Sequence, residues 1–248
     1  MTPPILVVPA MILAAGRGER MRPLTDDCPK PLLQVQGKAL IDWHVDALAR
    51  GSVHTLVVNT AWLGENISSH LDLLSNQDGY EQLSFSYSHE GDDFGYALET
   101  AGGIARALPL LGQVFWLLAA DVFVPGFEFL PEAVSRFIAG DKLAHLWLVP
   151  NPAHNPRGDF GLHSSGLALN LAADDPAPRY TYSTIGLYRC ALFDTLPFGN
   201  SPGLAVALAP LLRAAMDRQQ VSAELYHGAW TDVGTPERLA ELNQHFSH

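Results

Sequence analysis

A short apolar run that ends in a glycine loop rich in arginine constrains this chain more than any other feature. Residues 11–15 have the length and character of a buried strand. Gly16 and Gly18 follow at once, and Arg17 and Arg20 lie beside them. Glycine adopts positive φ and lets the backbone approach a ligand closely, so successive N–H groups of such a loop can surround an anion. The sequence therefore predicts a strand followed by an anion-binding loop.

The spacing of the loop separates it from two common phosphate loops. A dinucleotide fingerprint needs a third glycine where this chain has Met21, and no G-x-x-x-x-G-K-[ST] string occurs. A nicotinamide dehydrogenase is therefore disfavoured. The loop closes at Pro29-Lys30-Pro31. The two prolines predict an extended segment that holds Lys30 in a fixed direction, with little packing of its side chain to lose.

Charge supports a small anionic ligand. The chain carries 15 Lys and Arg against 26 Asp and Glu, a net charge of −11, which argues against nucleic acid or an anionic membrane as the main partner. Four of the 15 basic residues nevertheless lie in the loop, namely Arg17, Arg20, Arg22 and Lys30. We expect this local concentration of positive charge to bind a small anion.

The cysteines and the apolar start predict a cytoplasmic protein. Cys28 and Cys190 lie far apart and form no C-x-x-C motif, so neither a disulfide framework nor a zinc knuckle is indicated. No Lys or Arg precedes the apolar stretch 5–15, which is also too short to cross a bilayer. We interpret the residues before Met11 as a short extension into the first strand.

Alternating strand and helix patterns predict the fold class. Strands are expected at 11–15, 53–59, 83–88, 114–120 and 143–149, and helices at 41–50, 66–74, 102–108, 203–216 and 235–245. This order predicts an α/β fold, a Rossmann-like and mostly parallel sheet with helices on both faces, whose ligands bind at the carboxyl ends of the strands. The shorter, polar, alternating segments in 159–188 predict a small β-rich part.

Two aspartates have the surroundings of ligand-binding residues. Asp121 follows an apolar run, so its carboxylate must reach a cleft, or else it serves as a turn or N-cap residue. Asp232 lies in the segment Trp230-Thr231-Asp232-Val233-Gly234-Thr235-Pro236.

Together these segments resemble a known family. The loop reads L-A-A-G-x-G-x-R-M-x-P-L-T from residue 13 to residue 25 and is followed by P-K-P, and the downstream segment reads W-x-D-x-G-T-P. Both strings resemble the signatures of sugar-1-phosphate nucleotidyltransferases. The resemblance covers nearly the whole chain. It implies a single domain, 1–248, with a nucleotide-binding half at about 11–122 and a sugar-binding half at about 143–235.

The resemblance also implies roles for individual residues. It implies that Arg20 and Lys30 are catalytic and that Asp121 and Asp232 bind Mg²⁺. The nucleotide would be bound by Ala14, Ala15, Gly16, Gly18, Glu90 and Gly102. Two departures from the family pattern stand out: Ala119-Ala120 replaces an Asn-Gly pair, and no Glu-Lys-Pro segment for the sugar phosphate is present near 172–176.

The substrates implied are UTP and N-acetylmuramic acid 1-phosphate, which would give a nucleotide sugar and pyrophosphate in the recycling of cell-wall peptidoglycan. This sugar carries a lactyl carboxylate, for which small polar donors are suited. We expect Asp159, Thr181 and Ser183 in the sugar pocket, with Arg157 as a further donor. GTP with mannose 1-phosphate remains the alternative within the family, and a non-catalytic nucleotide-sugar sensor the alternative outside it.

Overall fold

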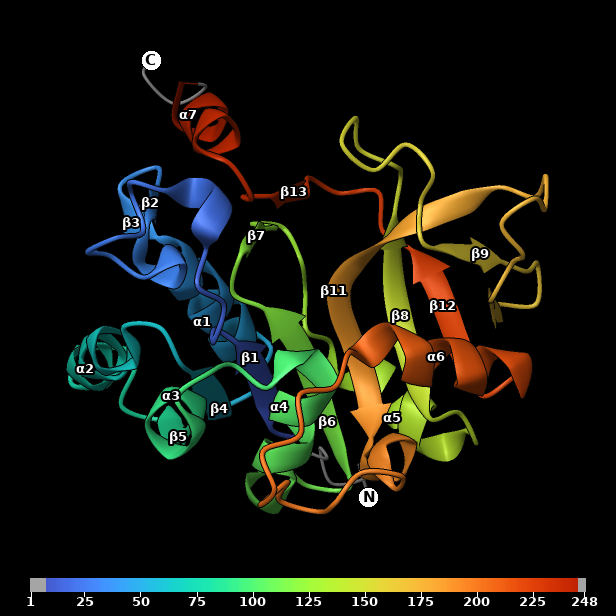
Figure 1. The fold of residues 1–248 in the computed structure, drawn as a ribbon, viewed down its shortest axis with the longest axis horizontal. Helices are drawn as coiled ribbons and strands as arrows, with labels where there is room; N and C mark the ends of the chain where they lie inside the picture. The colour runs from blue at the N-terminus through green and yellow to red at the C-terminus, as the bar shows by residue number, and fades with distance from the viewer. Residues whose placement is uncertain (1–7, 245–248) are drawn as a thin grey trace.

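The structure, a computed structural model, describes residues 8–244 (Figure 1). The strands are β1 (Ala10–Leu13), β2 (Gln34–Val35), β3 (Lys38–Ala39), β4 (Thr55–Thr60), β5 (Ser84–His89), β6 (Val114–Ala119), β7 (Val122–Phe123), β8 (Ala144–Val149), β9 (Phe160–Leu162), β10 (Ala168–Leu169), β11 (Arg179–Arg189), β12 (Val221–Leu225) and β13 (Thr231–Asp232).

The α-helices are α1 (Leu40–Arg50), α2 (Gly64–Ser75), α3 (Glu90–Phe94), α4 (Glu99–Ala107), α5 (Pro131–Ala139), α6 (Leu208–Asp217) and α7 (Pro236–Gln244). Short 3-10 helices occupy Glu19–Met21, Lys30–Leu32, Leu108–Leu110 and Cys190–Phe193.

One mixed sheet of nine strands organises the described chain. Its main path runs β10-β9-β11-β6-β1-β4-β5, and β8 and β12 branch from β11. The strands β6, β1, β4 and β5 are parallel, whereas β11 is antiparallel to β6, β8 and β9. The predicted α/β class with a mostly parallel core is therefore confirmed, and the predicted β-rich part corresponds to the antiparallel strands β9, β10 and β11.

Helices cover both faces of the sheet because buried side chains alternate along its strands. Ile12 and Trp116 face α1, α2 and α5, which contribute residues such as Val45 and Leu71. The neighbouring residues on β1 and β6 point to the other face, where they pack against α4 and α6. The central strands are thus apolar on both faces, as expected for buried parallel strands.

Two local predictions were wrong. Residues 203–207 precede α6 as an irregular segment, because the Val206 carbonyl accepts the N–H groups of Ala101 and Gly102 at the start of α4 (2.8 and 3.0 Å). Lys30 begins a 3-10 turn rather than an extended segment. Pro31 is compatible with that turn, because a proline in the first turn of a helix lacks only an N–H group that needs no partner there.

The C-terminal helix predicted at 235–245 is α7, although residue 245 lies outside the described residues. Asn243 of α7 accepts the N–H of Gln36 at 2.7 Å and donates to the carbonyl of Gln34 at 3.1 Å. Figure 1 shows α7 beside the β2–β3 hairpin. The last helix therefore packs on the segment that follows the glycine loop. No helix in 8–244 is long and apolar enough to cross a membrane.

Candidate active site

A cavity of about 830 Å³ opens at the carboxyl ends of the parallel strands. One side, the loop wall, consists of Leu13, Ala14, Ala15, Gly16, Gly18, Glu19, Arg20, Met21, Lys30, Pro31, Leu117, Ala119, Ala120 and Asp121. Another side, the strand wall, consists of Asp159, Phe160, Tyr182, Thr184, Ala207, Leu208, Ala209, Leu212 and Arg213. The lining is completed by Asn59, Glu90, Ala97, Glu99, Thr100 and Gly234. The cavity lies where the general rule for ligand binding in parallel sheets places it.

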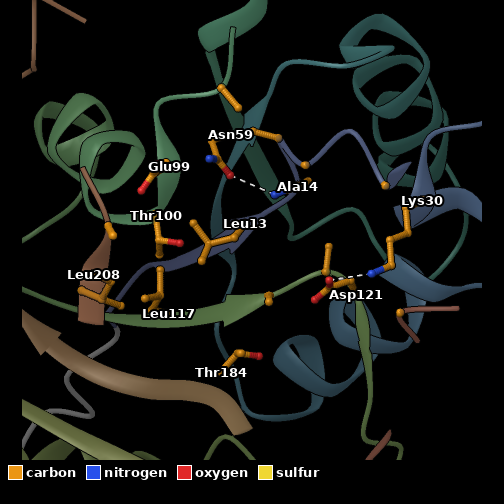
Figure 2. Close-up of a pocket in the computed structure, with 18 of the residues that line it drawn as sticks. Leu13, Ala14, Lys30, Asn59, Glu99, Thr100, Leu117, Asp121, Thr184 and Leu208 are labelled. Carbon is orange, nitrogen blue, oxygen red and sulfur yellow. Dashed lines mark hydrogen bonds and ion pairs between the residues drawn. The ribbon is translucent and has the colours of Figure 1, made fainter. Parts of the chain in front are cut away.

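A buried hydrogen-bond chain fixes the start of the glycine loop. Ala14 donates its N–H to the Asn59 side-chain oxygen at 2.9 Å (Figure 2). The Asn59 amide in turn donates to Glu90 at 2.7 Å. Glu90 also accepts the N–H of Leu98 at 2.7 Å. Burial raises the pKa of the Glu90 carboxyl above its usual value, although both hydrogen bonds oppose the shift. Glu90 therefore connects β4, α3 and α4 to the loop.

A glycine on α4 makes room for this carboxylate. A Cβ at Gly103 would lie 2.4 Å from Glu90 Oε1. Gly102, the predicted nucleotide-binding glycine, lies outside the cavity lining and packs against the segment before α6, where its Cβ would lie 2.3 Å from the Leu204 carbonyl oxygen. The glycine pair thus serves close packing at both positions.

The loop itself is shaped by Gly18 and Thr25. Gly18 has φ +67°, and Thr25 donates its hydroxyl to the Gly18 carbonyl at 2.8 Å. Arg17 donates to the Thr25 carbonyl at 2.8 Å and stacks its guanidinium over Trp62, 3.5 Å from the ring centre. Arg22 is paired with Asp26 at 2.7 Å. Two of the four clustered cations therefore hold the loop together.

The other two cations face the cavity. Lys30 is 7% exposed, and its Nζ lies 2.7 Å from Asp121 Oδ2 at the end of β6 (Figure 2). Arg20 lines the cavity, is exposed, and has no hydrogen-bond or ion-pair partner within residues 8–244. An arginine without a counter-ion at a cavity is well placed for a phosphate ligand.

Strand pairing brings Asp121 and Asp232 together along the backbone. The two-residue strands β7 and β13 pair with each other, and Asp232 lies opposite Val122. Next to this pair, the Val233 N–H donates to the Asp121 carbonyl at 2.9 Å. The Asp232 carboxylate accepts a hydrogen bond from Arg238 at 2.8 Å and lies 3.3 Å from His154. Gly234, two residues further, lines the cavity.

A buried histidine, His44, stabilises the pairing of β7 with β13 through a hydrogen bond to β7. His44 Nε2 lies 2.8 Å from the Val122 carbonyl, which requires the N–H to be on that nitrogen. Burial lowers the pKa of His44 to about 4. The ring is therefore neutral at pH 7 and fixes the strand that carries the first aspartate into the cavity.

The donor set of the two aspartates fits a magnesium ion. Mg²⁺ prefers oxygen ligands, keeps several waters and is usually held by one or two carboxylates with substrate phosphates. No cluster of three or more His, Cys, Asp or Glu residues suitable for a metal occurs within the described part of the chain. The two carboxylates lie on adjacent backbone segments, Asp121 in the turn after β6 and Asp232 on β13, and each is paired with a basic side chain. An ion held by these two oxygen donors would be completed by substrate rather than by a protein cage.

The predicted sugar residues divide between structural and cavity positions. Thr181 donates to Asn151 at 3.0 Å, and the fully buried Ser183 donates to the Trp147 carbonyl at 2.6 Å. Neither residue lines the cavity, whereas Asp159 does. The Asp159 carboxylate accepts the Tyr182 N–H at 2.8 Å and so joins β11 to the segment before β9. Arg157 is exposed and is not part of the lining.

Thr184 was missed by sequence reasoning. It lies at the register shift of β11 between Tyr182 and Gly186, adopts φ +67°, and lines the cavity (Figure 2). Its buried hydroxyl has no hydrogen-bond partner among the described residues. Positive φ is costly for a β-branched residue, and such strain is concentrated at functional sites. Arg213 on α6 was also missed, because a single arginine on a helix face carries no motif.

Known proteins match this chain along almost its whole length. The model of the family described as nucleotidyl transferase matches residues 9–248. The chain belongs to this family. It is an enzyme family whose members generally use a divalent metal ion.

Relatives match almost end to end. The chain is 45% identical over 242 residues to N-acetylmuramate alpha-1-phosphate uridylyltransferase from Neisseria meningitidis, covering 94% of this chain and 95% of the relative. It is 32% identical to the protein of the same name from Caulobacter vibrioides, covering 94% and 97%. A crystal structure of a putative glucose-1-phosphate thymidylyltransferase from Bacillus anthracis has the same fold, with a TM-score of 0.74, 19% identity, and coverage of 96% and 94%.

Proposed function

We propose that this protein transfers a uridylyl group from UTP to N-acetylmuramic acid 1-phosphate, giving UDP-N-acetylmuramic acid and pyrophosphate. The 45% identity over nearly the full length of both chains carries the proposal. The cavity supports it, because its loop wall offers Arg20 and the Lys30–Asp121 pair to phosphates. The activity places the protein in the recycling of peptidoglycan.

In the proposed complex, the nucleotide lies against the loop wall and the sugar against the strand wall. The backbone of Ala14, Ala15, Gly16 and Gly18 would position the nucleotide, and Asp159 would accept hydrogen bonds from sugar hydroxyl groups. Residues 11–122 and 143–235 would thus form the two halves of one domain. Glu90 would act by fixing the Ala14 backbone through Asn59.

The chemical step needs positioning and charge neutralisation. An oxygen of the sugar phosphate forms a bond to the α-phosphorus of UTP as the bond to the bridging oxygen breaks, and pyrophosphate leaves with that electron pair. Arg20 and Lys30 would bind the phosphates and stabilise the negative charge that grows on the leaving group. Asp121 and Asp232 would hold Mg²⁺, which supplies further charge neutralisation on the phosphates.

The test is a comparison of substrates by pyrophosphate release in the presence of Mg²⁺. We expect kcat/KM for UTP with N-acetylmuramic acid 1-phosphate to exceed that for UTP with N-acetylglucosamine 1-phosphate, and that for GTP with mannose 1-phosphate, by at least ~10-fold. Equal or reversed values would reject the substrate assignment. Tight nucleotide-sugar binding without pyrophosphate release from any pair would instead favour a sensor.

A further inference from the structure

Arg213 is the basic residue of the strand wall. It lies on α6, is half-buried, and lines the same cavity as Arg20 and Lys30. Two arginines near β9 and β11, Arg157 and Arg179, do not line the cavity. Arg157 is exposed, and Arg179 donates to the carbonyls of Ala172 and Asp175. Positive charge on the strand wall therefore comes from one guanidinium.

That guanidinium is held in place by neutral groups. Nη1 donates to Asn170 Oδ1 at 2.8 Å, and Nη2 donates to the Asp159 carbonyl at 3.3 Å. Its central carbon lies 5.1 Å from the centre of the Phe160 ring. Asn170 is in turn fixed by donating to Asp217 at 3.0 Å. The Arg213 side chain is thus oriented from three sides before any ligand binds.

Its charge has no counter-ion in the part of the chain that the structure describes. Within residues 8–244, no carboxylate lies within ion-pair distance of Arg213, whereas Lys30 is paired with Asp121. The Asp159 carboxylate is adjacent but accepts hydrogen bonds from the Tyr182 N–H and from Asn155. A half-buried cation with neutral partners gains more from an incoming anion than a cation that is already paired, because no existing ion pair has to be broken.

We propose that Arg213 binds the lactyl carboxylate of the acceptor sugar and so selects N-acetylmuramic acid 1-phosphate over sugars that lack this group. The inference rests on the proposed function, which supplies the carboxylate. A guanidinium binds a carboxylate through two parallel hydrogen bonds, and Arg213 has N–H groups beyond the two already used. The phosphate of the acceptor is then left to the cations of the loop wall.

The test compares two sugars that share the 1-phosphate and differ in the lactyl group. Arg213→Gln is expected to lower kcat/KM for N-acetylmuramic acid 1-phosphate by at least ~10-fold and to change that for N-acetylglucosamine 1-phosphate by less than ~3-fold. Arg213→Lys keeps the charge and should recover part of the preference. Arg218→Gln, an exposed arginine just beyond α6 that lies outside the cavity lining, is the matched control and should leave both values unchanged.

A loss of equal size with both sugars would overturn the inference, because it would mean that Arg213 binds the shared phosphate or only supports the fold. A binding measurement distinguishes a wrong assignment of Arg213 from a failure of the proposed function. Both sugar phosphates are titrated calorimetrically into protein saturated with Mg²⁺ and the α,β-methylene analogue of UTP. A preference for the carboxylated sugar that disappears in Arg213→Gln supports the inference even where no pyrophosphate is released. The same affinity for both sugars in the unmodified protein would reject it.

Discussion

The two walls of the cavity are built in different ways. The loop wall comes mostly from one continuous stretch of chain, residues 13–31, in which Gly18, Thr25 and Arg17 contact one another. The strand wall collects single residues from β9, β11 and α6, far apart in sequence. Its key cation has neutral partners, whereas Lys30 on the loop wall is already paired. The difference suggests that the loop wall provides the reaction common to the family and the strand wall provides the choice of sugar.

The largest effect is expected from the two aspartates assigned to the metal, Asp121 on the loop wall and Asp232 on β13, just outside the cavity lining. Asp121→Asn and Asp232→Asn should each reduce turnover by at least ~10²-fold, the scale observed when a stabiliser of transition-state charge is lost. Folding should be retained, since Asn has nearly the same size. The measurement is pyrophosphate release at saturating Mg²⁺ with circular dichroism as the check on folding. Asp174→Asn, at an exposed position away from the cavity, is the control. Near-normal turnover of either variant would remove the metal assignment.

A smaller loss is expected from Lys30→Ala. The sequence suggested that this side chain has little packing to lose. In the structure it is buried next to Gly18 and paired with Asp121. We therefore expect turnover to fall by ~10- to 100-fold and the free energy of unfolding to fall by about 1–2 kcal/mol. Lys142→Ala, whose ammonium pairs with its neighbour Asp141, is the control. A large loss of stability with an unchanged rate would make Lys30 structural.

The same contrast explains what the sequence could predict. The strand followed by a glycine loop could be predicted because its contacts are local and leave contiguous motifs. The roles of Lys30, Asp121 and Asp232 came from such motifs too and stay predictions. Thr181 and Ser183 were chosen because their segment resembles the family and their side chains are small polar donors. The structure shows their hydroxyl groups hydrogen-bonded to Asn151 and to the Trp147 carbonyl. The register shift of β11 decides which side chains face the cavity, and a one-residue shift changes the face of a strand.

Short paired elements were also beyond sequence reasoning. The strands β7 and β13 contain two residues each, so they show no periodicity, yet their pairing brings the backbone segments of Asp121 and Asp232 next to each other. The helix α6 was placed in the right region but begins later than predicted, because Val206 is engaged by the start of α4. Tertiary hydrogen bonds, not local preference, set both features.

On the strand wall, Thr184→Gly should separate stability from activity. Glycine removes the strain of φ +67° and the unpartnered buried hydroxyl, so we expect unfolding to cost up to about 1 kcal/mol more, or a rise in Tm of about 2–4 °C. If the hydroxyl binds the sugar, kcat/KM should fall by ~3- to 10-fold. Gln219→Gly, at φ +58° and outside the cavity lining, should relieve strain without changing activity. Unchanged kcat/KM for Thr184→Gly would leave Thr184 without a role in the reaction.

The smallest effect is a pH dependence of stability from Glu90, which lies between the walls and fixes Ala14 through Asn59. Burial raises its pKa above the usual 4.5. The folded protein then binds this proton more tightly than the unfolded chain, so the contribution of Glu90 to stability is fully present below pH 4.5 and decreases as the pH rises through the raised pKa. Glu90→Gln does not titrate, so urea unfolding from pH 4 to pH 7.5 should show the advantage of the unmodified protein over this variant narrowing with rising pH. The contributions of all other groups cancel in this difference between the two free energies of unfolding. For the control Glu132→Gln, at an exposed position on α5, the difference from the unmodified protein should stay constant with pH. An advantage that widens with rising pH would mean that the hydrogen bonds from Asn59 and Leu98 outweigh burial, and that Glu90 is held as a carboxylate.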